Sequence, residues 1–240
     1  MIDREEAQEI IDRYGVNLTL PAVWLDDVPL DKSNRGNNLE FHKMGRDNQM
    51  IVGKYQILEN SLIRIRGNRN TLIIGDDVRI RNLKLLISSD DNVVMIGAGT
   101  SWEHGAIQCG PGGSTVLIGD DCMVSSAVVI RTNDGHGIFD LASRKLVNEP
   151  QNVIIHNHVW LGNGSRVGKG TTIGAGSVLG QMSLATGRLE PNAVYGGIPA
   201  KAIRRGIVWS RTFDLPEDLI EDGFVPKLVA NGERMGLVAP

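Results

Sequence analysis

Four aliphatic–glycine pairs recur at intervals of six residues in the second half of the chain: Leu161-Gly162, Val167-Gly168, Ile173-Gly174 and Leu179-Gly180. Two residues before each aliphatic stands a small or β-branched residue: Val159, Ser165, Thr171 and Ser177. A period of six fits neither a helix nor a plain alternating strand. It is typical of a parallel β-helix, in which each unit makes one short strand and one turn. We expect the aliphatic to face the core and the glycine to permit the tight corner that follows.

The same pattern continues upstream in two further sets of aliphatic residues: Ile118, Val124 and Ile130, and before them Ile74, Ile80 and Leu86. The pairs Ile74-Gly75, Ile96-Gly97 and Ile118-Gly119 are each 22 residues apart, which we interpret as three hexads plus a four-residue insertion at one corner. A β-sandwich with evenly spaced strands is the alternative. Four uninterrupted hexads with a small residue in phase favour the β-helix.

The composition agrees with a solenoid. Aromatic residues make up 5% of the 240 residues and glycines number 29, as expected for stacked coils filled by Val, Ile and Leu. The net charge of −3 gives no electrostatic basis for binding nucleic acid or a membrane surface. There is no apolar run of membrane-spanning length and no signal peptide at Met1, so we expect a cytoplasmic protein. Cys109 and Cys122 do not make a disulfide framework, and Cys122 falls on an inward position.

The chain divides into three parts. Residues 1–56 are expected to form a short N-terminal helix (residues 3–14) and an irregular lead-in. Residues 57–205 form the repeat domain, an all-β solenoid. Residues 206–240 lose the period and are expected to form a tail, helical at 215–220 and otherwise irregular.

One interruption of the repeat is expected to carry function. Ile130 and Ile155 are 25 residues apart where one hexad needs six, so about 19 residues are looped out between coils. The loop, residues 131–152, contains Asn133-Asp134-Gly135-His136 and, further on, Asp140. A long loop on a rigid scaffold is usually functional or disordered.

These features together resemble the hexapeptide-repeat acyltransferases. The stretch from Val159 to Val178 is similar to their repeats, and Tyr195-Gly196-Gly197-Ile198-Pro199-Ala200-Lys201 resembles their closing Gly-x-Pro-Ala-Lys signature. The Asn133-Asp134-Gly135-His136 loop resembles the catalytic insertion of the branch that acetylates saccharides and xenobiotics. The likeness is strong over residues 115–205, weak over 57–115 and absent at both ends.

The resemblance implies a left-handed parallel β-helix with about 18 residues per coil. The left hand departs from the usual right-handed crossover, so it rests on the family alone. The family is usually a homotrimer with active sites between neighbouring subunits. The donor it implies is an acyl-CoA, most often acetyl-CoA, and the acceptor is a hydroxyl or an amine.

His136 is the candidate general base. An imidazole can take and return a proton at cellular pH, as transfer of an acetyl group from a thioester to an alcohol requires. A carboxylate on the other ring nitrogen would fix the tautomer, and Asp134 and Asp140 are both candidates for that role. Backbone N–H groups at glycine-rich corners would meet the oxyanion.

Other candidate residues for binding acetyl-CoA follow from the resemblance. Trp160 is expected to stack on a sugar or to line the channel of the pantetheine arm. Lys201 and Arg204 follow the last coil and are expected to bind CoA phosphates. Three small residues are expected to leave room for the pantetheine arm: Gly162, Ala175 and Gly180.

The acceptor site is expected to include Trp102 and His104 from an earlier coil and Asn133 from the loop. We favour a saccharide hydroxyl as the acceptor, as in O-acetylation of a capsule, a lipopolysaccharide or a glycan precursor. A streptogramin-type xenobiotic and an amino sugar acetylated on nitrogen are the alternatives.

Two other functions fit the sequence less well. His156 and His158 form a His-x-His pair, and γ-type carbonic anhydrases on this fold hold zinc. Zinc needs three protein ligands and that family spaces its histidines differently, so no metal is expected. A non-enzymatic scaffold would have no histidine loop and no cationic tail.

Overall fold

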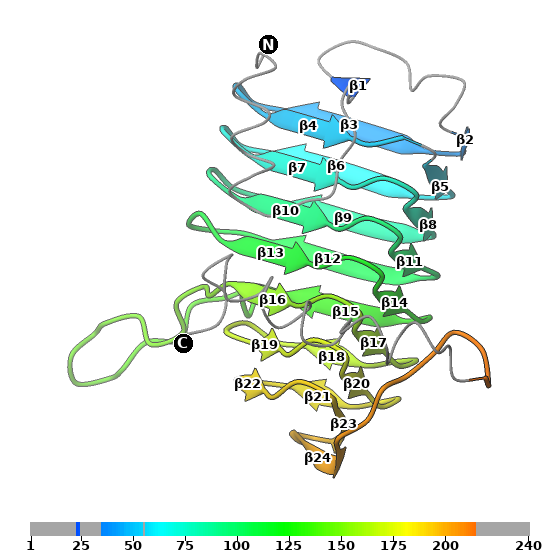
Figure 1. Cartoon of the computed structure of the whole chain (residues 1–240). Helices are drawn as coiled ribbons and strands as arrows, with labels where there is room; N and C mark the ends of the chain where they lie inside the picture. Colours follow the sequence, from blue (N-terminus) through cyan, green and yellow to red (C-terminus); the bar gives the residue numbers. More distant parts are fainter. Residues whose placement is uncertain (1–22, 25–34, 55, 215–240) are drawn as a thin grey trace.

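The computed structural model describes residues 23–24, 35–54 and 56–214, which form a left-handed parallel β-helix (Figure 1). Each coil adds one short strand to each of three sheets, and the side chains that point inward fill the space between the sheets. The expected helices at residues 3–14 and 215–220 lie outside the described residues. No helix in the described part of the chain is long and apolar enough to cross a membrane.

Three sheets form the sides of the β-helix. Sheet A contains, in spatial order, β1 (Val23–Trp24), β4 (Gln49–Val52), β7 (Thr71–Ile74), β10 (Val93–Ile96), β13 (Thr115–Ile118), β16 (Val153–Ile155), β19 (Thr172–Ile173) and β22 (Arg188–Leu189). Sheet B contains β2 (Arg35–Asn37), β5 (Ile57–Glu59), β8 (Arg79–Arg81), β11 (Ser101–Trp102), β14 (Met123–Val124), β17 (Trp160–Leu161), β20 (Val178–Leu179), β23 (Ala193–Gly197) and β24 (Ala200–Arg205). Sheet C contains β3 (Glu40–Met44), β6 (Leu62–Arg66), β9 (Leu83–Ile87), β12 (Gly105–Cys109), β15 (Val128–Arg131), β18 (Arg166–Val167) and β21 (Leu184–Ala185).

The hexad positions face the core as predicted. The aliphatic positions of the second half are at most 1% exposed: Ile155, Leu161, Val167, Ile173 and Leu179. Their companions two residues earlier are all 0% exposed: Val153, Val159, Ser165, Thr171 and Ser177. Two of the three buried hydroxyls are hydrogen-bonded to the next coil, from Thr171 Oγ1 to the Ala185 carbonyl at 3.2 Å and from Ser177 Oγ to the Glu190 carbonyl at 3.0 Å, whereas Ser165 Oγ has no partner among the described residues. A small polar residue therefore fits this position, and at Thr171 and Ser177 its hydroxyl is satisfied by a backbone carbonyl.

The glycines of the hexads serve a purpose other than the one expected. Gly162 does not have a left-handed backbone conformation. The left-handed residue at this corner is Gly164 (φ 69°), so Gly162 is not needed for its conformational freedom. A Cβ on Gly162 would lie 2.7 Å from the Gln181 nitrogen and 2.7 Å from the Leu179 carbonyl oxygen. The glycine is needed because the backbone of the next coil passes directly against it.

Coils in the first half are longer, as the 22-residue spacing predicts. The expected insertion at a single corner is wrong, because the extra residues lengthen the strands of sheets C and A. β7 and β10 have four residues each, whereas β19 and β22 have two. β9 and β12 have five residues each, whereas β18 and β21 have two. The prediction that Leu86 points inward is wrong by one position, because its neighbours Leu85 and Ile87 face the core. The turn before them, with Asn82 left-handed (φ 50°), is one residue shorter than a regular corner.

The β-helix begins before residue 57, the boundary expected from the sequence. β2, β3 and β4 pair in parallel with the strands of the following coil. Met50 (4% exposed) and Val52 (0%) occupy the same inward positions as Leu72 and Ile74 one coil later. Val52-Gly53 stands 22 residues before Ile74-Gly75, so the repeat was already visible in the sequence.

Both cysteines belong to the core, as expected for Cys122. Cys109 is 2% exposed and Cys122 is 0% exposed. Burial raises the pKa of each thiol to about 12. Neither thiol is therefore available as a nucleophile at neutral pH.

We predict that truncating an inward residue costs far more stability than truncating an exposed one of the same type. Ile173→Ala removes a 0% exposed side chain and should lower the free energy of unfolding by about 2–5 kcal/mol. The control Ile203→Ala removes a side chain that is 71% exposed and should change it by about 0.5 kcal/mol or less. Equal losses in urea unfolding would show that the inward positions do not carry the stability.

Candidate active site

The long loop leaves the β-helix where sheet C passes into sheet A. It follows β15 and precedes β16, and it stands out from the side of the solenoid (Figure 1). Its root is closed by a hydrogen bond from the Gln151 N–H to the Thr132 carbonyl at 2.9 Å. Further out, Phe139 and Leu146 form an isolated antiparallel bridge. The loop is thus a narrow arm with a fixed root.

A hydrogen-bonded clamp holds the segment that carries His136. Asn148 Nδ2 donates to Asp134 Oδ2 at 2.9 Å and to the His136 carbonyl at 2.8 Å. Asn148 Oδ1 accepts from the Ile138 N–H at 2.7 Å. Lys169 Nζ, from the coil below, donates to Asp134 Oδ2 at 2.6 Å and to the Asn148 carbonyl at 2.8 Å. The clamp therefore ties the outer loop to the rigid solenoid on both sides of His136.

Neither candidate carboxylate bonds the imidazole of His136 in the described part of the chain. The hydrogen bond from Lys169 is the main reason that the pKa of Asp134 lies below its usual value. Asp140 accepts from the Ser143 N–H and hydroxyl, both at 2.7 Å, and these bonds lower its pKa. Both carboxylates are engaged in shaping the loop, so the orienting role predicted for one of them is not visible in a single chain.

His136 lines a cavity of about 90 Å³ beside the loop root, together with Pro111, Asp134, Leu146 and Asn148. Sites for small molecules are usually about 300–1,000 Å³. One chain alone therefore forms only a fraction of the space that a donor and an acceptor would need.

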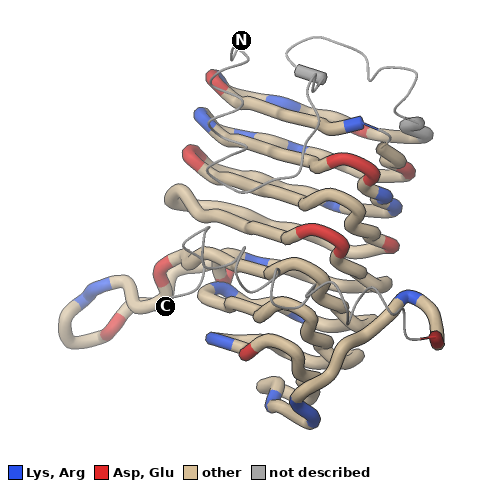
Figure 2. Tube along the Cα trace, viewed as in Figure 1, with Lys and Arg blue, Asp and Glu red and all other residues tan. Residues whose placement is uncertain are grey.

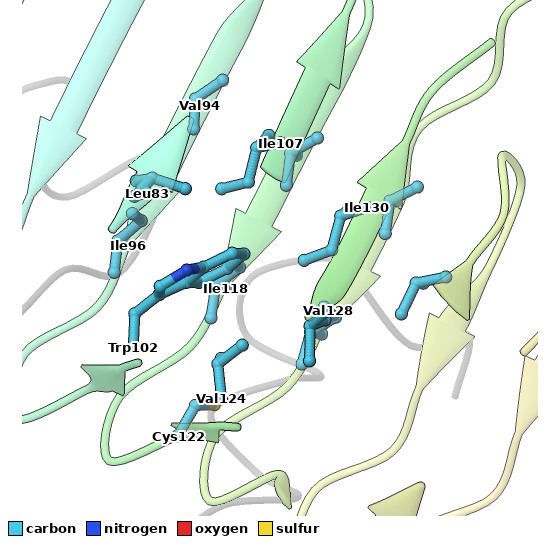
Figure 3. Packing of buried hydrophobic residues seen from close by; sticks show 14 of the residues in the cluster. Leu83, Val94, Ile96, Trp102, Ile107, Ile118, Cys122, Val124, Val128 and Ile130 are labelled. Atoms are coloured by element: carbon cyan, nitrogen blue, oxygen red, sulfur yellow. The ribbon is translucent and has the colours of Figure 1, made fainter. Parts of the chain in front are cut away.

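The three residues expected to bind the acceptor have different environments. Trp102 is 0% exposed and points into the core with Ile107 and Ile118 (Figure 3). Its prediction as an acceptor contact is wrong, because the inward position of β11 turns its ring away from the surface. His104 is exposed at the next corner, where its Nδ1 accepts from the Ala127 N–H at 3.2 Å.

The side chain of Asn133 forms two hydrogen bonds at the loop root. Its Nδ2 donates to the Gly110 carbonyl at 3.2 Å and its Oδ1 accepts from the Gly135 N–H at 2.8 Å. The second bond forms a local turn that leads the chain into His136. Its expected part in binding the acceptor stays a prediction.

Trp160 lies on a different face of the solenoid from His136. It stands on the outer side of sheet B, half-buried, with its Nε1 donating to Ser125 Oγ at 3.2 Å. Its ring is tilted against that of Trp209, with centroids 6.0 Å apart. Sheet B and the root of the loop are on opposite sides of the view in Figure 1, so one chain does not bring Trp160 and His136 together.

A hydrogen-bonded group around a buried histidine, His158, lies beside Trp160 and was missed in the sequence. His158 is 2% exposed, and its Nδ1 lies 2.7 Å from Asp121 Oδ2 while its Nε2 lies 2.9 Å from the Trp209 carbonyl. Both ring nitrogens therefore face oxygen atoms that accept hydrogen bonds, and the ring is held from two sides. Trp209 stacks on this ring at 4.1 Å and donates to the His158 carbonyl at 2.7 Å. Arg211 completes the group by donating to Asp121 Oδ1 at 2.9 Å.

This group of four residues fixes the segment after β24 against sheet B and supports the ring of Trp160. Burial alone raises the pKa of Asp121, but the hydrogen bonds from His158 and Arg211 outweigh it, and the net pKa lies below the usual value. The His-x-His pair was the signal in the sequence, but its second histidine binds Asp121 and Trp209. In the described residues no group of three His, Cys, Asp or Glu side chains is arranged for a metal ion.

The residues expected to bind acetyl-CoA lie on the last coils. Gly162 is buried under the following coil, which gives it a structural role. Ala175 lines a second cavity, of about 200 Å³, between β19 and β22. Gly180 is half-buried near the Tyr195 carbonyl. Lys201 and Arg204 are exposed on β24, where Figure 2 shows basic residues at the end of the solenoid.

Comparison with known proteins places these observations in a family context. No protein-family model matches the chain. A polysialic acid O-acetyltransferase of Neisseria meningitidis is 36% identical over 185 residues, which are 77% of this chain and 85% of that protein. One from Escherichia coli O1:K1 / APEC is 43% identical over 91 residues, 38% of this chain, and the match spans only 30% of that relative.

Two solved structures are similar along most of the chain. The polysialic acid O-acetyltransferase OatWY has a TM-score of 0.69 and 30% identity, with 81% of this chain and 98% of that one covered. The polySia-specific acetyltransferase NeuO has a TM-score of 0.59 and 30% identity, with 82% and 96% covered. The likeness therefore extends over about four fifths of this chain and nearly the whole of each solved structure.

We predict that the clamp controls the order of the loop. Asn148→Ala removes three hydrogen bonds, one of them to a carboxylate, and bonds of that kind contribute about 1.5–3 kcal/mol. Amides of residues 135–138 should therefore exchange about 10- to 100-fold faster in hydrogen-exchange mass spectrometry. The matched control is Asn163→Ala, at an exposed corner, which should leave the loop unchanged. Unchanged exchange in Asn148→Ala would show that the clamp does not hold the loop.

We also predict an acid-sensitive contribution from Asp121. Folding lowers its pKa below the value of about 3.9 in the unfolded chain. Its carboxylate therefore stabilises the fold above about pH 4, and this contribution is lost as the pH falls through the folded pKa. Asp121→Asn should be less stable than the unaltered protein at pH 6 but lose less stability on acidification, as measured by thermal unfolding. Asp77→Asn, an exposed control, should keep the original profile, and parallel profiles for all three proteins would contradict the assignment.

Proposed function

Since this chain belongs to the polysialic acid O-acetyltransferase family of hexapeptide-repeat saccharide O-acetyltransferases, we propose that it transfers an acetyl group from acetyl-CoA to a hydroxyl of a sialic acid polymer. The observation that carries the proposal is the histidine loop, clamped at the junction of sheets C and A within the region aligned with these relatives. A xenobiotic acceptor and an amino-sugar acceptor have no comparable support.

His136 acts as the general base in the proposed reaction. It takes the proton of the acceptor hydroxyl as the oxygen attacks the thioester carbonyl, and it returns that proton to the departing CoA sulfur. The ester C–O bond forms, the thioester C–S bond breaks, and the histidine ends in its starting state. Backbone N–H groups stabilise the tetrahedral oxyanion. No covalent intermediate on the protein is needed.

The proposed site takes residues from two copies of the chain. His136 and Trp160 lie on different faces, and the cavity at His136 is about 90 Å³. The loop also exposes apolar side chains that a second copy would cover: Ile138 (56% exposed), Phe139 (61%), Leu141 (97%) and Val147 (59%). A loop carrying both a base and exposed apolar residues suits insertion against a neighbouring sheet B, as in the homotrimer that the family suggests.

The donor has a proposed place on the last coils. Lys201, Arg204 and Arg205 are exposed and form no ion pair within the described part of the chain, so their charges are available to the phosphates of CoA. Ala175 and Gly180 present little side chain to the narrow pantetheine arm. Trp160 then lies between these coils and the base of the neighbouring copy.

Mixing two inactive variants tests this function and its two-copy site together. The unaltered protein should transfer acetyl from acetyl-CoA to polysialic acid, and His136→Ala should lower turnover by about 10²- to 10⁴-fold through loss of the base. Trp160→Ala should also be impaired. When the two variants are co-expressed and assemble at random, about one quarter of the sites combine an intact His136 from one copy with an intact Trp160 from the next. Activity should therefore recover to about one quarter of the original.

The control mixes His136→Ala with the double variant His136→Ala/Trp160→Ala, which supplies no intact histidine and should restore nothing. Activity of the first mixture no higher than the average of its two components would refute the two-copy site while leaving the reaction intact. Failure of the unaltered protein to acetylate the polymer would refute the proposed function.

A further inference from the structure

The outer face of sheet C carries a set of cations that the proposed active site does not use. The strand register places five basic side chains on this surface, which we call the basic face: Arg64, Arg66, Lys84, Arg131 and Arg166. Their strand neighbours point inward and are buried, as Ile63, Leu85 and Ile130 are at 2%, 0% and 0% exposed. None of the five is in an ion pair within the described residues, and one of them, Arg166, donates hydrogen bonds to three backbone carbonyls of its own and the preceding coil.

The other two sheets carry their cations differently: Arg79 is the one unpaired cation on β8 of sheet B among the described residues, and the exposed Lys201, Arg204 and Arg205 lie together on β24 at the end of the solenoid. On sheet B, Arg81 lies between Glu59 at 3.1 Å and Glu103 at 3.5 Å, so its charge is compensated. On sheet A, Arg188 is paired with Glu190 at 3.1 Å. Among the described strand residues of sheet C the acidic one is Glu40, at the far end on the first coil. Within the described part of the chain, sheet C therefore carries unpaired cations on several coils of a protein whose net charge is −3.

Four of the five cations are arranged along the axis of the solenoid in two rows, and Arg66 lies beside them on β6. One row runs through paired residues of successive coils: Arg64, Leu86, Gln108 and Arg131. The second row is parallel to it: Lys84, Ala106, Val129 and Arg166. Each row places cations three strand spacings apart, about 14 Å at about 4.8 Å per strand. The residues between the cations in each row are uncharged, so no acidic side chain interrupts a row.

The row of the basic face that runs from Arg64 to Arg131 ends at the proposed catalytic loop. Arg131 is the last residue of β15, and the loop begins at the following residue, Thr132. His136 is five residues beyond Arg131, and the clamp through Lys169 holds its segment against the same side of the solenoid. A chain lying along the basic face would thus be led to the root of the loop.

We propose that the basic face binds the polymeric acceptor as an extended polyanion, aligned with the axis of the solenoid and running to His136. The inference rests on the proposed function, because a sialic acid polymer carries one carboxylate per residue. Each exposed guanidinium or ammonium contact is weak by itself. Five of them on one rigid face act together, raising the local concentration of a long anion and guiding it to the site. A short acceptor reaches the same site without using the face.

The test compares two double variants that each lose two positive charges. Arg64→Gln/Lys84→Gln removes two cations of the basic face that are remote from the loop. The control Lys54→Gln/Arg79→Gln removes two that lie off sheet C. Acetyl transfer is measured with polysialic acid and with a short sialic acid oligomer, each at several salt concentrations.

In the first variant the KM for the polymer should rise about tenfold, with kcat and the KM for acetyl-CoA unchanged. Its kcat/KM should also depend less on salt. The KM for the short oligomer should change by less than about twofold, and the control should match the unaltered protein in every respect. Retention of the polymer KM, or an equal rise for the short oligomer, would overturn the proposal.

Two further results are separated from these. If the unaltered protein acetylates neither acceptor, the proposed function fails. The role of the basic face is then tested separately, by calorimetric titration of polysialic acid in the absence of acetyl-CoA. Binding that is weaker in the first variant than in the control supports the basic face, and equal or absent binding overturns it. If sedimentation shows that the first variant alone changes its oligomeric state, the face contacts another copy of the chain and the proposal is overturned.

Discussion

The close stacking of successive coils is the constraint on which the rest of the structure depends. Backbones of neighbouring coils pass so near each other that a Cβ on Gly162 or Gly174 would meet the next coil at 2.7 Å or 2.4 Å. The same register places each inward aliphatic above the next and aligns buried polar side chains, as Asn70 and Asn92 do through a hydrogen bond of 3.2 Å. A solenoid built this way can lengthen its strands in register from coil to coil, but a long insertion in a single coil fits only at a corner.

The long loop is such an addition, and it inherits its position from the coils on either side. The Thr132 hydroxyl at its root accepts a hydrogen bond from Ser114 Oγ at 2.7 Å. The loop root is therefore tied to a buried polar side chain of the preceding coil. Lys169 then holds Asp134 from the coil below at 2.6 Å. The rigid solenoid thereby holds the loop segment that carries His136 in one position. A proposed general base that must reach a bound acceptor needs such positioning. The exposed apolar arm beyond His136 is what remains for another copy to cover.

The sequence predicted the features that local repetition determines. Inward hexad positions such as Leu161 and Ile173 were assigned correctly, because each hexad places its aliphatic in the same environment. The one-residue shift of the inward positions after Ile80 was not predicted. It arises from a turn that is one residue shorter, and counting in steps of six does not detect such a turn. Trp102 was assigned to the surface, since a large indole is unusual at an inward position. The group of His158, Asp121 and Arg211 joins residues up to 90 positions apart, and no local pattern carries such a contact.

The central claim is that acetyl-CoA binds where two copies of the chain meet. Calorimetric titration of acetyl-CoA into the assembled protein, and into a Phe139→Asp/Leu141→Asp variant confirmed as a monomer by sedimentation, tests it most directly. Saturable binding of one donor per chain in the assembly, with loss of binding in the monomer, is the predicted result. No binding to the assembled protein at millimolar donor, or equal binding by the monomer, would contradict it.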